Sequence, residues 1–392
     1  MVGLGKDSDG SVAAALQVEG EAERAEAEAP LPLFTLRVGQ PADELAGAAG
    51  PRAELPLGAP QAPWAPAARA SDAGARDFSA VCWWLGRAVA AALGGGVPVG
   101  LIESAWGGST VQAWSTPASL AACAAPPQPS VWWMPGCPSC FFHSHVAPFA
   151  VGPLHVSGLA VYLGETQALF GQAGYYACGL PRLLEDLGAA FGGGVPWAGV
   201  VELAPWHSSE ANEGVAAVRA AQLATARGWR LDGGGAVRAV SVAPASDCGD
   251  AAGGIHPRRK RALGLRLGRA AVGAAPASGP AYLRAEALAG GAVRVQFAAG
   301  SAEGGVRLAA PPPACPEGVP RAACMGLEVQ LSDGGWRPAE ASTEGGALLL
   351  RAAGNEGGLV VATRSGQAAF PLAAVVGAVD GLPAHPWSAP IG

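Results

Sequence analysis

Three groups of residues along this chain could together hydrolyse an ester. Gly107 and Gly108 let the backbone approach a ligand closely and can offer N–H donors to a developing oxyanion. Glu165 follows an apolar run, and His256 stands in GGIHPRRK. Glycine donors, an acid and a histidine base form an ester-hydrolysis constellation that needs only a nucleophile. Each part also has a structural interpretation: the glycine pair as a turn, Glu165 as a helix-capping acid and His256 as a helix-start residue.

Strands and helices alternate in the part of the chain that carries these residues. Apolar runs typical of strands occupy residues 33–38, 97–104, 155–164, 195–203 and 236–244, and helical spacing occupies 12–28, 78–93, 175–191, 214–226 and 257–273. This alternation predicts a mostly parallel sheet with helices on both faces, whose ligands bind at the carboxyl ends of the strands. Because each candidate group follows a predicted strand, we expect all three at that edge.

Two segments near the N-terminus complete this part of the prediction. Ser8, Asp9 or Ser11 can cap the first helix. The segment 39–76 is rich in Pro, Ala and Gly and has little periodicity, so it is predicted to be a long surface excursion.

The sequence changes to an all-β pattern after about residue 275. Short alternating runs at 292–297, 327–331, 347–351 and 359–364 predict strands, and SDGG at 332–335 predicts a turn between two of them. We therefore predict an α/β domain over residues 1–275 and a β-sandwich-like module over 276–392. A length of 392 residues fits one large and one smaller domain.

Composition and charge exclude two classes of partner. The net charge is −6 and no basic stripe accompanies the aromatic residues, so nothing indicates nucleic-acid binding. The basic run 258–261 is read as a solvated helix face. No window approaches eighteen unbroken apolar residues, so we expect no membrane span. The first twelve residues lack the apolar core of a signal peptide.

The eight cysteines leave the redox compartment open. Cys315 and Cys324 bracket a Pro-containing loop that a disulfide could close. Cys137 and Cys140 have C-x-x-C spacing, but no second pair lies at zinc-finger distance and no βαβ pattern flanks them. Redox or metal chemistry is therefore not the favoured interpretation of this pair.

Several blocks resemble the sialate O-acetylesterase family in order and spacing. These blocks are FSAVCWWLGR, VPVGLIESAWGGSTVQAWS, GLAVYLGET, GGIHPRRKRALGLRL and the terminal GLPAHPW. The resemblance covers most of the chain and is strongest between residues 78 and 266. It implies an SGNH-type hydrolase fold, in which a histidine-activated serine attacks an acetyl ester on a sugar hydroxyl. The implied substrate is an O-acetylated sugar, and no metal or organic cofactor is implied.

The resemblance also assigns roles to individual positions. His256 matches the family's catalytic histidine, Gly108 falls in the glycine block linked to the oxyanion hole, and Glu165 matches the acid of the Q-G-E block. The family's nucleophile block, G-Q-S-N-M, precedes a segment that aligns with ALQV at 15–18. At that distance the chain reads GKDSDGSV, so Ser8 and Ser11 flank an aligned aspartate, and Ser8 is the candidate nucleophile.

Other positions depart from the family pattern. Leu163 replaces the family's glutamine before Gly-Glu, and Gln167 stands one position past the usual asparagine or aspartate. In FHSHVAPF the family's asparagine and histidine are displaced, and the histidines there are read as surface or structural residues. No acid lies three residues before His256, so Asp250 or Asp247 is the nearest residue that could orient its ring.

Three hypotheses follow for the whole chain. The first is an acetyl-ester hydrolase of the sialate O-acetylesterase type. The second is a catalytically inactive carbohydrate-binding relative, and the third is an incomplete gene model whose first strand and serine block lie upstream of Met1. The family implies secretion or lysosomal residence, which conflicts with the N-terminal sequence, so localisation stays open.

Overall fold

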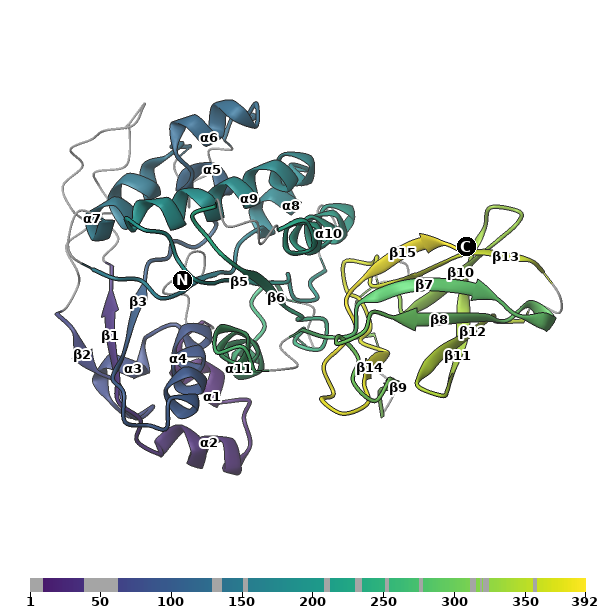
Figure 1. The fold of residues 1–392 in the computed structure, drawn as a ribbon, viewed down its shortest axis with the longest axis horizontal. Helices are drawn as coiled ribbons and strands as arrows, with labels where there is room; N and C mark the ends of the chain where they lie inside the picture. The colour runs from purple at the N-terminus through teal and green to yellow at the C-terminus, as the bar shows by residue number, and fades with distance from the viewer. Residues whose placement is uncertain are drawn as a thin grey trace.

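The fold was analysed in a computed structural model, which has an α/β part and a β module joined end to end (Figure 1). The structure describes residues 10–38, 63–128, 136–150, 154–207, 212–229, 235–250, 254–274, 278–310, 315–317, 319, 324–354 and 358–392. The α/β elements run as far as helix α11, and the module begins with strand β7 (Figure 1).

The predicted single helix over 12–28 is wrong, because the chain forms two helices there. These are α1 (Val12–Leu16) and α2 (Glu21–Glu28), with Gly20 at the N-cap of the second. The side chain of Arg24 donates to the carbonyl of Leu16 at 3.1 Å, which satisfies an acceptor at the end of α1. Ser11 caps α1, since its Oγ accepts the N–H of Ala14 at 3.1 Å.

The first parallel strands form a small sheet in the order β2-β1-β3. Strand β1 (Leu33–Arg37) pairs in parallel with β3 (Val99–Glu103), and β2 (Ala65–Pro66) pairs antiparallel with β1. The predicted excursion 39–76 therefore contains β2 and a short helix, α3 (Ala73–Arg76). Its residues 39–62 lie outside the described part of the chain.

A second parallel sheet has the order β4-β5-β6 and carries the later candidate residues. Its strands are β4 (Leu159–Val161), β5 (Ala198–Val201) and β6 (Val240–Ala243). The four long helices of this part are α4 (Ala80–Ala92), α9 (Ala173–Ala190), α10 (Asn212–Gly228) and α11 (Lys260–Ala271). In Figure 1, α9 and α10 lie on one side of the strands and α4 and α11 on the other, as the alternation predicted.

Helices α4 and α11 pack closely because two glycines of α11 face α4. A Cβ at Gly264 would lie 2.5 Å from Cβ of Trp84, and one at Gly268 would lie 2.5 Å from Cβ of Ala88. Ser79 begins α4 by accepting the N–H of Cys82. This close packing holds α11, which begins four residues after His256.

Short helices fill the connections between the long elements. They are α5 (Val111–Trp114), α6 (Pro117–Ala122), a π-helical turn η1 (Phe142–Val146), α7 (Ala147–Ala150), α8 (Glu165–Leu169) and the 3₁₀ turn η2 (Ala289–Gly291). Within the described residues, no helix combines the length and the apolar character needed to cross a membrane.

The β module is antiparallel and has a core of its own. Seven strands pair in the order β15-β13-β10-β11-β12-β8-β7, and β14 pairs with β9. Their bounds are β7 (Tyr282–Ala287), β8 (Val293–Phe297), β9 (Val306–Leu308), β10 (Leu327–Leu331), β11 (Trp336–Glu344), β12 (Ala347–Ala352), β13 (Val360–Ser365), β14 (Val375–Gly377) and β15 (Trp387–Pro390). The turn predicted at 332–335 joins β10 to β11.

Six cysteines pair as disulfides, and two buried thiols remain. Cys315 pairs with Cys324, as the sequence suggested. Cys137 pairs with Cys140, and Cys123 joins the end of α6 to Cys178 of α9. Burial raises the pKa of the Cys82 thiol to about 11, so it is protonated at neutral pH.

Candidate active site

The loop after β3 is held by hydrogen bonds to the loop after β4. Gly108 has a φ of +73°, a conformation that disfavours a side chain. Its carbonyl accepts a hydrogen bond from Oγ1 of Thr166 at 2.8 Å. Within the loop, Oγ of Ser109 donates to the carbonyl of Trp106 at 2.8 Å and accepts Nε1 of Trp114 at 2.8 Å. The glycine loop is therefore a fixed structure beside Glu165.

Glu165 starts α8 at the carboxyl end of β4 and is partly buried. The preceding Gly164 has a φ of +141°, and a Cβ there would lie 2.8 Å from Cγ1 of Val218. Burial raises the pKa of the Glu165 carboxyl, while the charges of Lys260 and His256 act against that rise. The structure thus brings Glu165 and His256 within electrostatic reach of each other.

His256 lies in the segment before α11, and the turn that follows β6 is bonded to the same helix. Arg266 of α11 donates to Asp247 through two nitrogens at 2.8 and 2.6 Å. Burial alone would raise the pKa of Asp247, but the hydrogen bonds and charge of Arg266 outweigh it and lower that pKa. Asp247 is therefore an ion-pair partner of Arg266, which leaves Asp250 as the candidate to orient His256.

Lys260 corrects the interpretation of the basic run as a solvated helix face. Its side chain is 1% exposed, and Nζ lies 4.9 Å from the centre of the Tyr162 ring. The sequence did carry a signal for this: Lys260, Leu263 and Leu267 share the buried face of α11 at helical spacing. Lys260 is a positive group of the site that sequence reasoning missed.

A chain of glutamine amides joins the two loops a second time. Gln167 is fully buried and donates to Oε1 of Gln112 at 3.0 Å. Gln112 in turn donates to Oε1 of Gln172 at 2.8 Å. Sequence reasoning singled out Gln167 but not the other two, although Gln112 stands in the same block as Gly107 and Gly108.

The histidines of FHSHVAPF occupy an aromatic environment. His145 is 1% exposed and packs against Phe141, Trp106 and Trp114. Its Nδ1 shares a hydrogen bond of 2.6 Å with Oγ of Ser144. Burial lowers the pKa of His145 to about 4, so the ring is neutral at pH 7. This environment fits the structural interpretation of His145.

The candidate nucleophile Ser8 lies outside the described residues. Ser11 is described, and its hydroxyl accepts the N–H of Ala14 as the cap of α1. The structure thus brings Gly108, Glu165 and His256 to the carboxyl edge of the strands, and the nucleophile stays a prediction.

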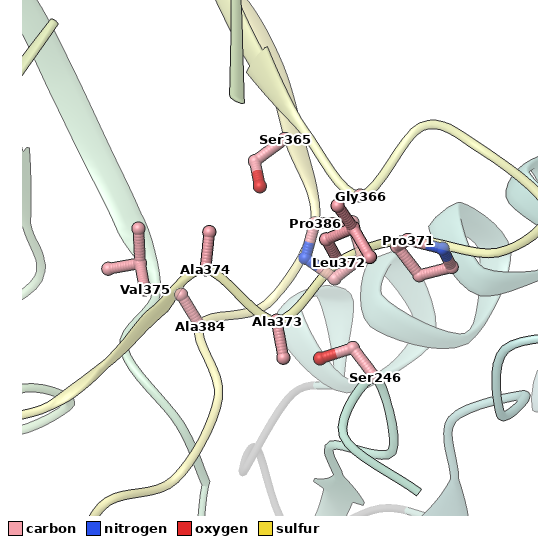
Figure 2. Close-up of a pocket in the computed structure, with 10 residues that line it drawn as sticks. All are labelled: Ser246, Ser365, Gly366, Pro371, Leu372, Ala373, Ala374, Val375, Ala384 and Pro386. Carbon is pink, nitrogen blue, oxygen red and sulfur yellow. The ribbon is translucent and has the colours of Figure 1, made fainter. Parts of the chain in front are cut away.

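A small pocket lies where the two parts meet, and none of the predicted site residues lines it (Figure 2). Ser246, which follows β6, lines it together with Ser365 and Ala384 of the module. Its volume of about 10 Å³ is near the minimum for one water molecule. Oγ of Ser246 is buried and has no hydrogen-bond partner among the described residues.

Comparison with known proteins gives both sequence and fold relatives. No family model matches the chain. Sialate O-acetylesterases match it at 35% identity over 113 residues in Pongo abelii, 34% over 113 in Homo sapiens and 29% over 139 in Mus musculus. The resemblance to the sialate O-acetylesterases is thereby confirmed. Each match covers 28% of this chain, and it spans about a fifth to a quarter (21 to 25%) of the sialate O-acetylesterase.

The fold likeness extends much further along the chain than the sequence match. The crystal structure of a carbohydrate acetylesterase from Xanthomonas citri superimposes with a TM-score of 0.71. It covers 99% of this chain and 80% of that one, at 23% identity. The α/β part and the β module therefore occur together in a solved protein of this fold.

Proposed function

We propose that this chain hydrolyses O-acetyl esters of sialic acid or related sugars by a serine–histidine mechanism. The observation that carries the proposal is the joining of three loops at one edge of the strands. Gly108 is bonded to Thr166, and the charge of His256 acts on the neighbouring Glu165. The sialate O-acetylesterase relatives support the type of ester.

Each residue has a defined part in the proposed reaction. Ser8 attacks the acetyl carbonyl while His256 accepts its proton, and the backbone around Gly108 stabilises the oxyanion. His256 then protonates the leaving sugar hydroxyl and later activates the water that releases acetate. Glu165, which lies near His256 and beside the glycine loop, binds the substrate. Only side chains and backbone donors are used.

The proposal includes a finer description of the fold. Residues 1–275 form an SGNH-type three-layer domain, and residues 276–392 form a β-sandwich-like module. The fold likeness to the Xanthomonas citri enzyme supports this division. Two separate hydrophobic clusters, one in each part, support it independently.

The test is acetate release from an O-acetylated sialic acid by the full chain and by Ser8→Ala and His256→Ala variants, all carrying Ser278→Ala so that the Ser278–His385 pair cannot contribute. We expect each substitution to lower kcat/KM by about 10³-fold or more, as removal of a member of such a dyad does. His155→Ala, which removes an exposed histidine, is the matched control and should keep full activity. Retained activity in both variants would refute the proposal, whereas binding of an acetylated sugar without turnover would favour an inactive relative.

A further inference from the structure

A serine, a histidine and a glutamate form one hydrogen-bonded row where the β module meets the α/β part. Nε2 of His385 shares a hydrogen bond with Oγ of Ser278. Nδ1 of the same ring lies 3.2 Å from Oε2 of Glu202. This connectivity, hydroxyl to Nε2 and carboxylate to Nδ1, is that of a serine hydrolase triad. The residues are 183 and 107 positions apart in sequence.

The burial of the three side chains follows the pattern that nucleophilic catalysis needs. Glu202 is fully buried and His385 is 3% exposed, whereas Ser278 is partly exposed. Glu202 directly follows β5, so the row begins at the carboxyl edge of the same parallel sheet as Glu165. A buried acid and base behind an accessible hydroxyl keep the ring dry and leave the nucleophile reachable.

A positive charge lies close to Glu202. Arg219 lies nearby: burial lowers the pKa of its guanidinium to about 10, and the charge of Glu202 opposes that fall. Oε1 of Glu202 has no hydrogen-bond partner among the described residues. In a triad the carboxylate in this position orients the imidazole and stabilises the imidazolium that forms during the reaction.

The backbone holds the serine against the histidine. The N–H of His385 donates to the carbonyl of Pro280 at 3.0 Å. A Cβ at Gly279 would lie only 1.8 Å from the carbonyl oxygen of Pro383, so only glycine permits this approach of the two segments. The Ser278–His385 pair is thus preorganised by the fold.

We propose that Ser278 is a second nucleophile, which takes the acyl group of short-chain carboxylic esters with His385 as its base. Oγ of Ser278 forms a bond to the carbonyl carbon, and its proton passes to Nε2 of His385. The bond from that carbon to the alcohol oxygen then breaks, and the alcohol leaves with the proton. Water, deprotonated by His385, cleaves the acyl-serine and releases the carboxylic acid. Glu202 is the positioning residue.

The test is covalent labelling of the full chain with a fluorophosphonate, followed by tryptic digestion and mass spectrometry. The peptide 270–284 contains Ser278 as its single serine, and fragment ions distinguish it from Tyr282. Ser8 and Ser11 fall in a different peptide, 7–24. The same digest therefore reports on Ser278 and on the proposed nucleophile Ser8 separately.

We expect an adduct on peptide 270–284 that is lost in Ser278→Ala and in His385→Gln. Glu202→Gln should slow the labelling of Ser278 by about tenfold or more, because the ring loses its orienting charge. Glu202→Asp, which keeps the carboxylate, should restore part of the labelling rate that Glu202→Gln loses.

The control is Ser301→Ala, which removes a hydroxyl bonded only within the module and should leave the labelling unchanged. The proposal is overturned if peptide 270–284 carries no more adduct than in Ser278→Ala, or if His385→Gln labels at the wild-type rate. Labelling of peptide 7–24 alone would support Ser8 and refute Ser278.

Discussion

Buried charge is distributed very differently between the α/β part and the β module. Among the described residues, the α/β part buries the charged side chains of Arg87, Glu103, Glu202, Arg219, Lys260 and Arg266. In the module the core is aliphatic, and the buried ionisable residues are Glu328, paired with Arg364, and His385. Because burying charge is costly, each of these groups needs partners, and it is the α/β part that supplies most of them.

The comparison also gives the module a role. At the junction the module accepts two hydrogen bonds from Arg219 of α10. They reach the carbonyls of Ala368 and Ala369 at 2.7 Å each. The same guanidinium donates to Leu203 and Ala204 of the α/β part. The module thus also fixes the loop after β5.

The largest effect on the free energy of unfolding should come from removing the hydrogen bonds that Arg219 makes to both parts. Arg219→Met removes the hydrogen bonds to four buried carbonyls and the positive charge that acts on Glu202, which should cost about 3–5 kcal/mol. Urea unfolding measures the free energy of unfolding of the full chain. Arg227→Met, at the exposed end of the same helix, should change it by less than about 0.5 kcal/mol. Equal effects of the two substitutions would contradict a bridging role for Arg219.

The next effect concerns acid stability in the aromatic cluster around His145. Its pKa falls from 6.5 to about 4 on folding, so the unfolded chain binds the proton more readily. The stability of the wild type should therefore fall as the pH drops from 6.5 towards 4, by about 3 kcal/mol from this group.

Comparison with a His145→Gln variant isolates that contribution from the titrating carboxylates. The difference in free energy of unfolding between wild type and variant should shift in favour of the variant as the pH falls. A difference that stays constant between pH 7 and pH 4 would show that the ring is protonated equally in both states. Such a result would also mean that the His145 ring is solvated in the folded chain.

The smallest effect should come from Glu165, whose pKa is raised in the folded state. Its contribution to stability is present below the unfolded pKa of 4.5 and is lost as the pH rises through the folded value. Glu165→Gln should therefore gain stability relative to the wild type as the pH rises. The exposed Glu340→Gln is the matched control. If Glu340→Gln gained as much stability with rising pH as Glu165→Gln, burial of Glu165 would not be the cause of the gain.

Local patterns predicted most elements, because periodicity and turn chemistry act over a few residues. Helix α4, predicted at 78–93, spans Ala80–Ala92, and the turn at 332–335 joins two strands. The break between α1 and α2 was missed although Gly20, which is extended at the N-cap of α2, stands inside the segment. The apolar spacing had predicted one continuous helix over residues 12–28.

The site was predicted in part, and the rest depended on distant contacts. His256, Glu165 and Gly108 were chosen because each follows a strand, and parallel strands bring such loops together. The row formed by Glu202 and His385 joins residues 183 positions apart, for which the sequence has no local signal. Lys260 was predicted to be solvated because that prediction used its charge and not its position on the buried face of α11.

The central claim is that His256 serves as the base of an acetyl-ester hydrolase. The most direct test is acetate release from an O-acetylated sialic acid by the full chain, beside His256→Ala and His155→Ala. The account predicts turnover that His256→Ala abolishes and His155→Ala preserves. Turnover that survives in His256→Ala at the wild-type rate, or no turnover in any of the three, would contradict it.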